Sequence, residues 1–84
     1  MKKYTTSGCR SVTAENMTEA AEIFAARMAR KEFGKSAYCR TCNLESWSQD
    51  GSLGEYQAFI GYTPAGKHNS NTTAGKNIRF TVYA

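Results

Sequence analysis

One helical segment followed by three strand-like segments limits this chain to a small set of folds. An apolar repeat of helical spacing runs over Met17–Glu32 and stops at Gly34. The segments with strand character after it are Ser36–Cys42, Glu55–Tyr62 and Ile78–Tyr83. With 84 residues, the chain is long enough for one small domain. We therefore predict a single α+β domain, in which one helix packs on one face of a three- to four-stranded antiparallel sheet.

The segment before the helix predicts additional strand structure. Lys3–Thr6 and Cys9–Ala14 are strand-like, and the turn dipeptide Ser7-Gly8 separates them. Two interpretations fit this pattern: a short hairpin, or a single strand that is broken at the dipeptide. The predicted element order is accordingly ββαβββ or βαβββ. Both orders leave one face of the sheet without a helix to cover it.

The predicted helix has one apolar side, which we expect to pack on the sheet. Asn16 and Thr18 are both candidate N-caps, and Glu19 completes a capping box with Asn16. Ile23 falls beside the apolar stripe, either at the edge of the core or as an exposed contact. The stripe itself consists of Met17, Ala20, Ala21, Phe24, Ala25 and Met28.

Composition places the chain among globular proteins with a preference for acidic partners. Hydrophobic residues make up 40% and charged residues 21%, and the formal net charge is +4 at pH 7. A positive net charge favours binding to nucleic acid or to an acidic protein surface. At the helix end, Arg27, Arg30, Lys31 and Lys35 either stabilise the helix dipole or contact a partner. The start of the chain lacks the apolar run of a signal peptide, so we expect a cytoplasmic protein without membrane contact.

The inventory of titratable residues argues against an enzyme. The chain has one histidine, His68, and one aspartate, Asp50, and no convergent pair or triad of catalytic groups can be assembled. The long polar connection Thr63–Asn77 carries Gly66-Lys67 and Gly75-Lys76 but no complete phosphate-loop motif. We predict no catalytic residues and no cofactor.

The three cysteines, Cys9, Cys39 and Cys42, are predicted to be free thiols because their number is odd and no export signal accompanies them. Strand alternation places Cys39 and Cys42 on opposite faces. A zinc site would need Cys9 and His68 to join the pair, and we predict instead that the thiols are buried and bind no metal.

Strand alternation also predicts which side chains face the helix. The inner set comprises Ala37, Cys39, Thr41, Tyr56, Ala58, Ile60, Tyr62, Ile78, Phe80 and Val82. The outer set comprises Gln57, Phe59, Arg79, Thr81 and Tyr83, with Arg40 near them. Exposed aromatic rings among arginines are typical of the centre of an interface. They are equally typical of a surface on which single-stranded bases stack.

The segment Asn43–Gly54 decides whether Phe59 is exposed. As a loop, it could fold back and cover Phe59 with Leu44 and Trp47. As a long hairpin with extended arms, ending in the turn Asp50-Gly51, it would leave Phe59 open. Both interpretations fit the sequence.

The order of motifs along the chain resembles that of small type I anti-CRISPR proteins of phages and mobile elements. The motifs are Val12-Thr13-Ala14, Met17-Thr18-Glu19-Ala20-Ala21, Tyr38-Cys39-Arg40, Glu55-Tyr56-Gln57-Ala58-Phe59, Thr72-Thr73 in a polar loop, and Phe80-Thr81-Val82. The resemblance spans Cys9 to Tyr83.

This resemblance implies a stoichiometric inhibitor in the cytoplasm of the bacterial host. Its partner would be a subunit of the Cas effector complex or the nuclease that the complex recruits, and its effect would be to block DNA targeting. Many anti-CRISPR proteins are acidic mimics of DNA, whereas this chain is basic, so an acidic Cas surface or a seam between guide RNA and protein fits better. The alternative function is a small basic nucleic-acid-binding accessory protein, and the third is a small zinc or redox protein.

We predict that the open sheet face and the adjoining loops hold the partner. Aromatic and arginine side chains carry most of the energy at interfaces, whereas lysines at the rim steer association. The predicted apolar anchors are Trp47, Phe59 and Tyr83, and the predicted charge contacts are Arg40, Lys67, Lys76 and Arg79.

Overall fold

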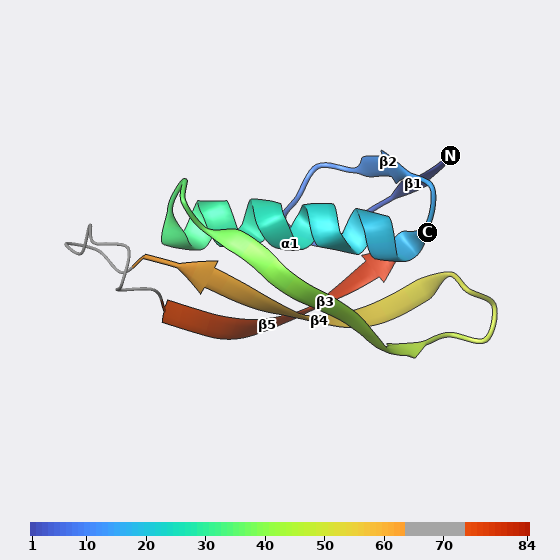
Figure 1. Ribbon diagram of the computed structural model, residues 1–84. Coiled ribbons are helices and arrows are strands. Elements are labelled where there is room, and N and C mark those ends of the chain that lie inside the picture. The colour runs from blue at the N-terminus through green and yellow to red at the C-terminus, as the bar shows by residue number, and fades with distance from the viewer. Residues whose placement is uncertain (64–73) are drawn as a thin grey trace.

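The computed structural model describes residues 1–63 and 74–84, which form the predicted α+β fold (Figure 1). A three-stranded antiparallel sheet packs on one side of a helix, and a separate two-stranded ribbon packs on another side of it. The elements are β1 (Lys2–Tyr4), β2 (Val12–Ala14), α1 (Met17–Phe33), β3 (Tyr38–Trp47), β4 (Leu53–Tyr62) and β5 (Ala74–Tyr83). Their order, ββαβββ, is one of the two that the sequence predicts.

Local capping fixes both ends of α1. The Oδ1 atom of Asn16 accepts a hydrogen bond from the backbone N–H of Glu19 at 2.9 Å, so Asn16 is the N-cap. At the other end, Gly34 has a φ of 104°, and its N–H donates to the carbonyl of Arg30 at 3.1 Å. The helix ends one residue later than predicted, at Phe33. Within the described residues, no helix is long and apolar enough to cross a membrane.

The buried side of α1 is lined mainly by alanine, which lets the helix lie close to the sheet. Phe24 is the large side chain among its buried residues and is fully enclosed. Met17 and Met28, predicted for the same stripe, are half-buried at its margins. The buried alanines are Ala20, Ala21, Ala25 and Ala29.

The inner face of the sheet carries the side chains that alternation predicts for β4 and β5. Tyr56, Ile60 and Val82 are fully buried against the helix. Tyr62 stacks on Phe33 at the end of α1, with 4.2 Å between ring centroids. Large side chains from the sheet thus fill the space beside the small side chains of the helix.

The ribbon at the N-terminus is tied to both the helix and the sheet. β1 and β2 pair antiparallel, with Tyr4 opposite Val12, so the N-terminal segment forms two paired strands rather than one broken strand. Beyond β1, Thr5 exchanges two backbone hydrogen bonds of 2.8 Å with Tyr83 at the end of β5. Ile23 packs against the cluster that contains Tyr4 and Val12, which makes it a residue of the core edge.

The segment Asn43–Gly54 is a hairpin with extended arms, and it does not fold back over Phe59. β3 continues to Trp47, β4 begins at Leu53, and the turn lies between them. Asp50 organises this turn. Hydrogen bonds from the side chain and backbone of Ser52, and from the Ser48 hydroxyl, lower the pKa of Asp50 to about 2.

The connection predicted over Thr63–Asn77 is too long at its C-terminal end. β5 begins at Ala74, so Ala74–Asn77 belong to the strand and pair with β4. Residues 64–73 lie outside the described residues. The earlier start of β5 brings Lys76 into the sheet.

A β-bulge at Arg40 changes the predicted alternation in β3. The register shifts between Cys39 and Thr41, so Arg40 is the extra residue. Cys39 and Cys42 therefore both oppose buried residues of β4 and lie on the helix side, and the prediction that they lie on opposite faces is wrong. Thr41, predicted to face inward, is exposed and opposes Phe59.

Replacing Phe24 with alanine should remove much of the stability of the domain. Because the side chain is fully buried, Phe24→Ala should lower the free energy of unfolding by about 3–5 kcal/mol, through lost burial and the cavity left behind. Urea unfolding measures this loss. Phe24→Leu, which keeps most of the volume, should lose less than about 1.5 kcal/mol. A Phe24→Ala protein as stable as the wild type would contradict this packing.

Candidate functional site

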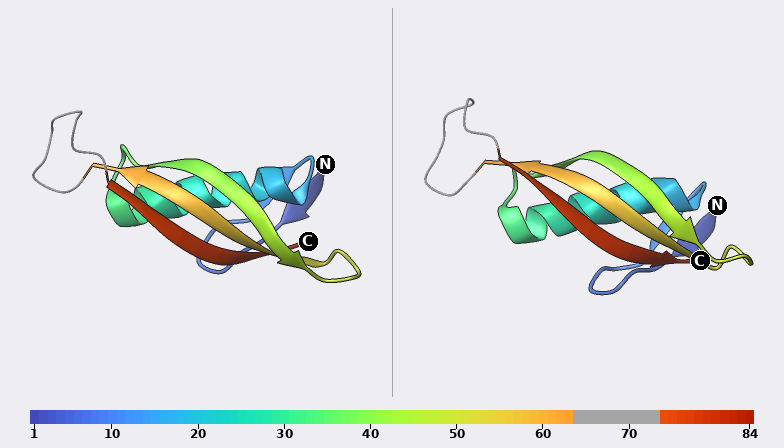
Figure 2. Two further views of the ribbon diagram at one scale, coloured as in Figure 1. Left: turned by 60° about the horizontal axis from the view of Figure 1, so that its bottom comes forward. Right: turned by 90° about the horizontal axis from the view of Figure 1, so that it is seen from below.

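The described elements leave uncovered the face of the sheet that points away from α1. Residues opposite each other in an antiparallel sheet share a face, so Phe59 shares this open face with Thr41 and Asn77. Figure 2 shows the sheet from this side, and none of the described elements crosses it. The prediction that one sheet face lacks a cover agrees with this arrangement.

Three side chains stack on one another at one end of the open face. The guanidinium carbon of Arg40 lies 5.5 Å from the ring centroid of Phe59 and 5.7 Å from that of Tyr38. The Nε–H of Arg40 also donates to the hydroxyl of Tyr38 at 3.2 Å. We call Tyr38, Arg40 and Phe59 the stacked group. The bulge at Arg40 adds the extra residue that places this side chain beside both rings.

Two glycines provide the floor of the stacked group. A Cβ atom at Gly75 would overlap Cζ of Phe59, and a Cβ atom at Gly61 would lie 2.7 Å from Cζ of Tyr38. The rings therefore lie directly against the backbone of β5 and β4. Phe59 is half-buried as a result, while Tyr38 stays 46% exposed. The stacked group is a preformed surface rather than a set of free side chains.

Charges of both signs lie on the open face beyond the stacked group. Farther along the open face, Nε of Arg79 lies 3.5 Å from a carboxylate oxygen of Glu45. Glu55 accepts a hydrogen bond of 2.7 Å from the hydroxyl of Ser46. With Arg40 and Arg79 balanced by Glu45 and Glu55, the open face is close to neutral.

Of the predicted contact residues, Arg40, Phe59, Arg79 and Tyr83 belong to the open face. They do not form one cluster. Tyr83 opposes Leu53, at the other end of the hairpin from Phe59, which corresponds to about 20 Å along the strand. Arg79 lies between them, and Tyr83 is 44% exposed.

Trp47 and Lys76, predicted as contacts from the loops that adjoin the open face, lie in β3 and β5 on the helix side of the sheet. Trp47 opposes Gly54, where an added Cβ atom would lie 2.6 Å from Sδ of Met17 at the start of α1. Lys76 opposes Ile60, and its Nζ lies 5.7 Å from the ring centroid of Phe33. Both residues belong to strands rather than to loops, because β3 continues to Trp47 and β5 begins at Ala74. Lys67 lies outside the described residues.

Tyr38 is the aromatic residue of the open face that the sequence prediction did not name. It stands opposite Gly61, and an aromatic side chain that covers a glycine across two strands is a recurrent way to fill a gap in a sheet. This signal becomes visible only when the register of the two strands is known.

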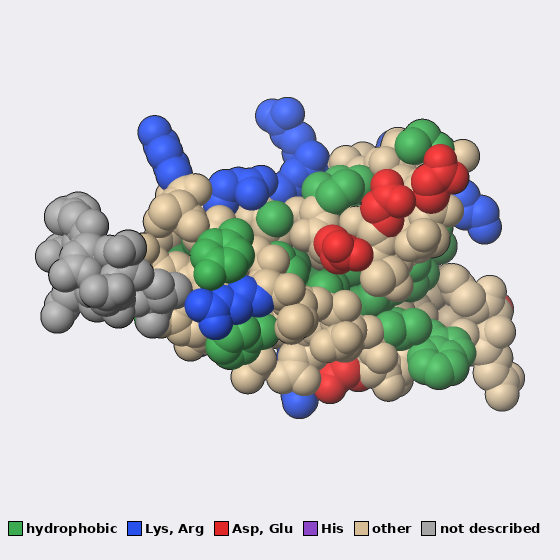
Figure 3. Space-filling model, in the orientation of Figure 1, with side chains coloured by type: hydrophobic (Ala, Val, Ile, Leu, Met, Phe, Trp, Pro, Cys, Tyr) green, Lys and Arg blue, Asp and Glu red, His purple; other side chains and the backbone are tan. Residues whose placement is uncertain are grey.

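Basic side chains gather on the helix side instead. Figure 3 shows lysine and arginine side chains projecting from the helix layer. Arg10 lies beside α1, since its carbonyl accepts a hydrogen bond of 3.4 Å from Arg27. Arg10, Arg27 and Lys31 line one hollow there. The positive charge of the chain is therefore largely separate from the stacked group.

The described residues provide no site for a metal. Within residues 1–63 and 74–84, no group of three or more His, Cys, Asp or Glu side chains could hold a metal ion. Cys9, Cys39 and Cys42 are free and half-buried, and His68 lies outside the described residues. Burial, with a smaller contribution from Glu22, raises the pKa of Cys39. A raised pKa keeps the thiol protonated and weakly reactive.

In comparisons with known proteins, no family model matches this chain, and no curated protein or solved structure matches it significantly.

Alkaline pH should destabilise the fold partly through Cys42. Burial, then the neighbouring Cys39 and Glu22, raise the pKa of Cys42 from 9.0 to about 12 in the folded protein. Below pH 9 the thiol is protonated in both states. As the pH rises from 9 towards 12, the unfolded chain loses this proton first, so the free energy of unfolding falls.

Urea unfolding at pH 8 and at pH 10 measures this effect. The fall in stability should be smaller for Cys42→Ala than for the wild type. Cys9→Ala, which removes a thiol outside the sheet, is the matched control and should follow the wild type. Equal falls for Cys42→Ala and the wild type would contradict the assignment.

Proposed function

We propose that this chain is a non-catalytic binding protein that uses the open sheet face to hold another protein. The observation that supports the proposal is the stacked group, which presents two aromatic rings and a guanidinium on an uncovered face. Such side chains provide most of the binding energy at protein interfaces. Because Arg40 is already held against both rings, little side-chain entropy is lost on binding.

The charge of the open face favours a protein partner over nucleic acid. A phosphate backbone needs a continuous run of cations, but Glu45 and Glu55 lie among the two arginines of this face. Base stacking needs open ring faces, and Arg40 lies over the ring of Phe59 while the Gly75 backbone supports it. Mixed charges around apolar rings suit a protein surface that carries both signs.

The resemblance to type I anti-CRISPR proteins supplies the partner in this proposal. The chain would act as a stoichiometric inhibitor in the cytoplasm of a bacterial host. It would bind a subunit of the Cas effector complex, or the nuclease that the complex recruits, and block the targeting or cleavage of DNA. The near-neutral open face supports binding to a Cas protein surface rather than imitation of DNA.

A small basic nucleic-acid-binding protein is the second candidate. The observation that favours it is the group of cations on the helix side, where Arg10, Arg27 and Lys31 line one hollow and Lys76 lies nearby. This surface is distinct from the stacked group, so variants can separate the two functions.

Two variants of the open face should abolish inhibition without unfolding the protein. Arg79→Glu reverses an exposed charge, and Phe59→Ala removes the centre of the stacked group. Loss of an anchor residue at an interface typically costs 2 kcal/mol or more, about a 30-fold loss of affinity. Phage plaque formation on a CRISPR-immune host measures inhibition, and a thermal melt of each variant measures folding.

Lys35→Glu is the matched control for the charge reversal, because Lys35 is exposed and lies outside the open face. It should keep full inhibition. If Arg79→Glu and Phe59→Ala are both folded and fully active, the open face is not the binding surface.

Binding to nucleic acid alone should be weak. If the second candidate function is correct, the isolated protein will shift a labelled oligonucleotide tightly, and the affinity will fall steeply as salt rises. We expect only weak binding at low salt, measured by fluorescence polarisation over a salt series. Tight, salt-sensitive binding without any Cas protein would make nucleic-acid binding the better proposal.

A further inference from the structure

The two edges of the sheet differ in regularity. The β3 edge is interrupted by register shifts at Arg40 and Glu45. The β5 edge has none, since Leu53–Tyr62 and Ala74–Tyr83 pair residue for residue. Bulges are one of the features by which proteins prevent a further strand from pairing with an edge. The β3 edge has this protection, whereas β5 keeps the regular geometry that a further strand requires.

The backbone groups on the β5 edge are oriented for such pairing. Both backbone groups of Tyr83 bond to Thr5, on the side away from β4. Because backbone direction alternates along a strand, the N–H and C=O groups of Arg79, Asn77 and Gly75 point to the same side. Within residues 1–63 and 74–84, these groups have no backbone partner on that side.

The N-terminal segment begins to pair with this edge and then leaves it. Thr5 bonds to Tyr83, and the hydroxyl of Thr6 donates to the carbonyl of Thr81. The chain then turns at Gly8, which has a φ of 79°, and continues to the ribbon beside the helix. None of the described residues forms a backbone hydrogen bond with β5 at the position in which the N-terminal segment would have continued along it.

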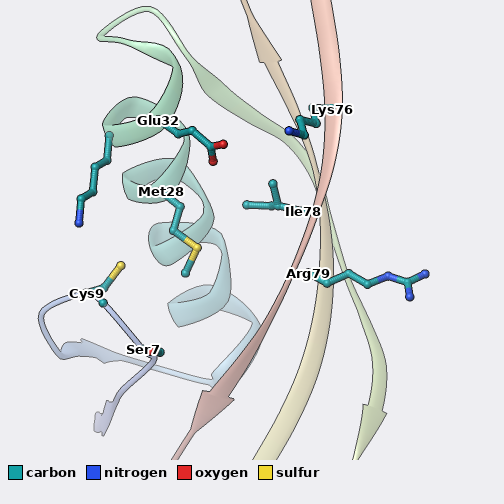
Figure 4. Close-up of a pocket in the computed structure, with 9 residues that line it drawn as sticks. Ser7, Cys9, Met28, Glu32, Lys76, Ile78 and Arg79 are labelled. Atoms are coloured by element: carbon teal, nitrogen blue, oxygen red, sulfur yellow. The ribbon is translucent and has the colours of Figure 1, made fainter.

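A cleft lies beside the open part of this edge, between β5 and the C-terminal half of α1. Its volume is about 650 Å³. Met28 of α1 and Ile78 of β5 face each other across it, and Cys9 lies at its lower end (Figure 4). Arg79 also borders it, but its side chain points away, towards the open face (Figure 4). The cleft can thus receive apolar side chains from a strand that pairs with β5.

Positive charge surrounds the cleft. Lys31 and Lys76 line it, with Glu32 as the acidic residue among its lining residues. The adjoining hollow, of about 330 Å³, shares Lys31 with the cleft and adds Arg10 and Arg27. Apart from Arg79, whose side chain points away, the cleft and the hollow together are thus lined by four cations and one carboxylate. Lys76 points to the helix side of this edge strand, where an unpaired charge opposes strand addition; a carboxylate on the added strand would offset that charge.

We propose that the β5 edge and this cleft together bind an extended acidic segment of a partner protein, which adds to the sheet as a further strand. Its backbone would pair with Gly75–Arg79, and alternate side chains would enter the cleft. Apolar side chains would contact Met28 and Ile78, and carboxylates would meet Lys31 and Lys76. This site is separate from the stacked group, so it goes beyond the proposed function.

A short fluorescein-labelled peptide tests the proposal by fluorescence polarisation; every second position carries valine and glutamate in turn, so that both kinds of side chain share one face of the strand, and the positions between them carry threonine. Two methylated peptides are compared, one N-methylated at the odd positions and one at the even positions. Strand addition predicts that only one of them binds more weakly, because only one of the two sets of N–H groups faces β5. The loss should be about tenfold or more. A peptide with lysine in place of glutamate should not bind.

Protein variants locate the site. Asn77→Pro removes an N–H that points away from β4, a position where an edge strand tolerates proline, and should weaken binding about tenfold. Lys76→Glu should weaken it at least as much at low salt, whereas the matched control Lys35→Glu should stay within about twofold of wild type. Phe59→Ala should leave peptide binding unchanged, which separates this site from the open face.

Several outcomes would overturn the proposal. These are the absence of binding at millimolar peptide, equal binding of the lysine peptide, and an affinity that N-methylation lowers at neither the odd nor the even positions. Sedimentation that shows a dimer which the peptide does not dissociate would instead indicate that β5 pairs with a second copy. The N-methylated peptides need no protein variant, so the test remains decisive if Asn77→Pro does not fold.

Discussion

The close contact between the alanine side of α1 and the inner face of the sheet is the interaction on which the rest of the structure depends. Small side chains at Ala21 and Ala25 let the helix approach the strands, and Phe24 and Tyr56 fill the space that remains. Gly34 ends the helix and allows the chain to return as β3. The helix covers one face of the sheet. No described element covers the other face, so the side chains of that face cover one another.

On the open face, the aromatic rings are partly covered by the side chains and backbone next to them. Tyr38 and Phe59 lie on the backbone of glycines in the neighbouring strand, and Arg40 lies over both rings. The apolar area of each ring is partly covered without a second layer of helices. A partner that binds here would meet a surface that is already ordered. This order is the physical basis for proposing a protein interface.

The separation of charge gives the molecule two surfaces of different chemistry. The open face pairs Arg79 with Glu45 and is near neutral, so it suits a surface with apolar and mixed polar groups. The cleft beside β5 is lined by two lysines and by apolar side chains, and it lies next to backbone groups that pair with none of residues 1–63 and 74–84. The two surfaces lie on opposite sides of the sheet, so one chain could contact two parts of a large assembly at once.

Features that depend on neighbours along the chain can be predicted from the amino-acid sequence. Asn16 and Gly34 define the helix ends through hydrogen bonds within one turn, and alternation predicts the inner face of β4 and β5 because these strands are regular. The bulge at Arg40, and the sides of the sheet on which Trp47 and Lys76 lie, follow instead from the pairing of the strands. A shift of one residue moves a side chain to the other face, and the register that sets this shift comes from hydrogen bonds between strands, which no local pattern encodes.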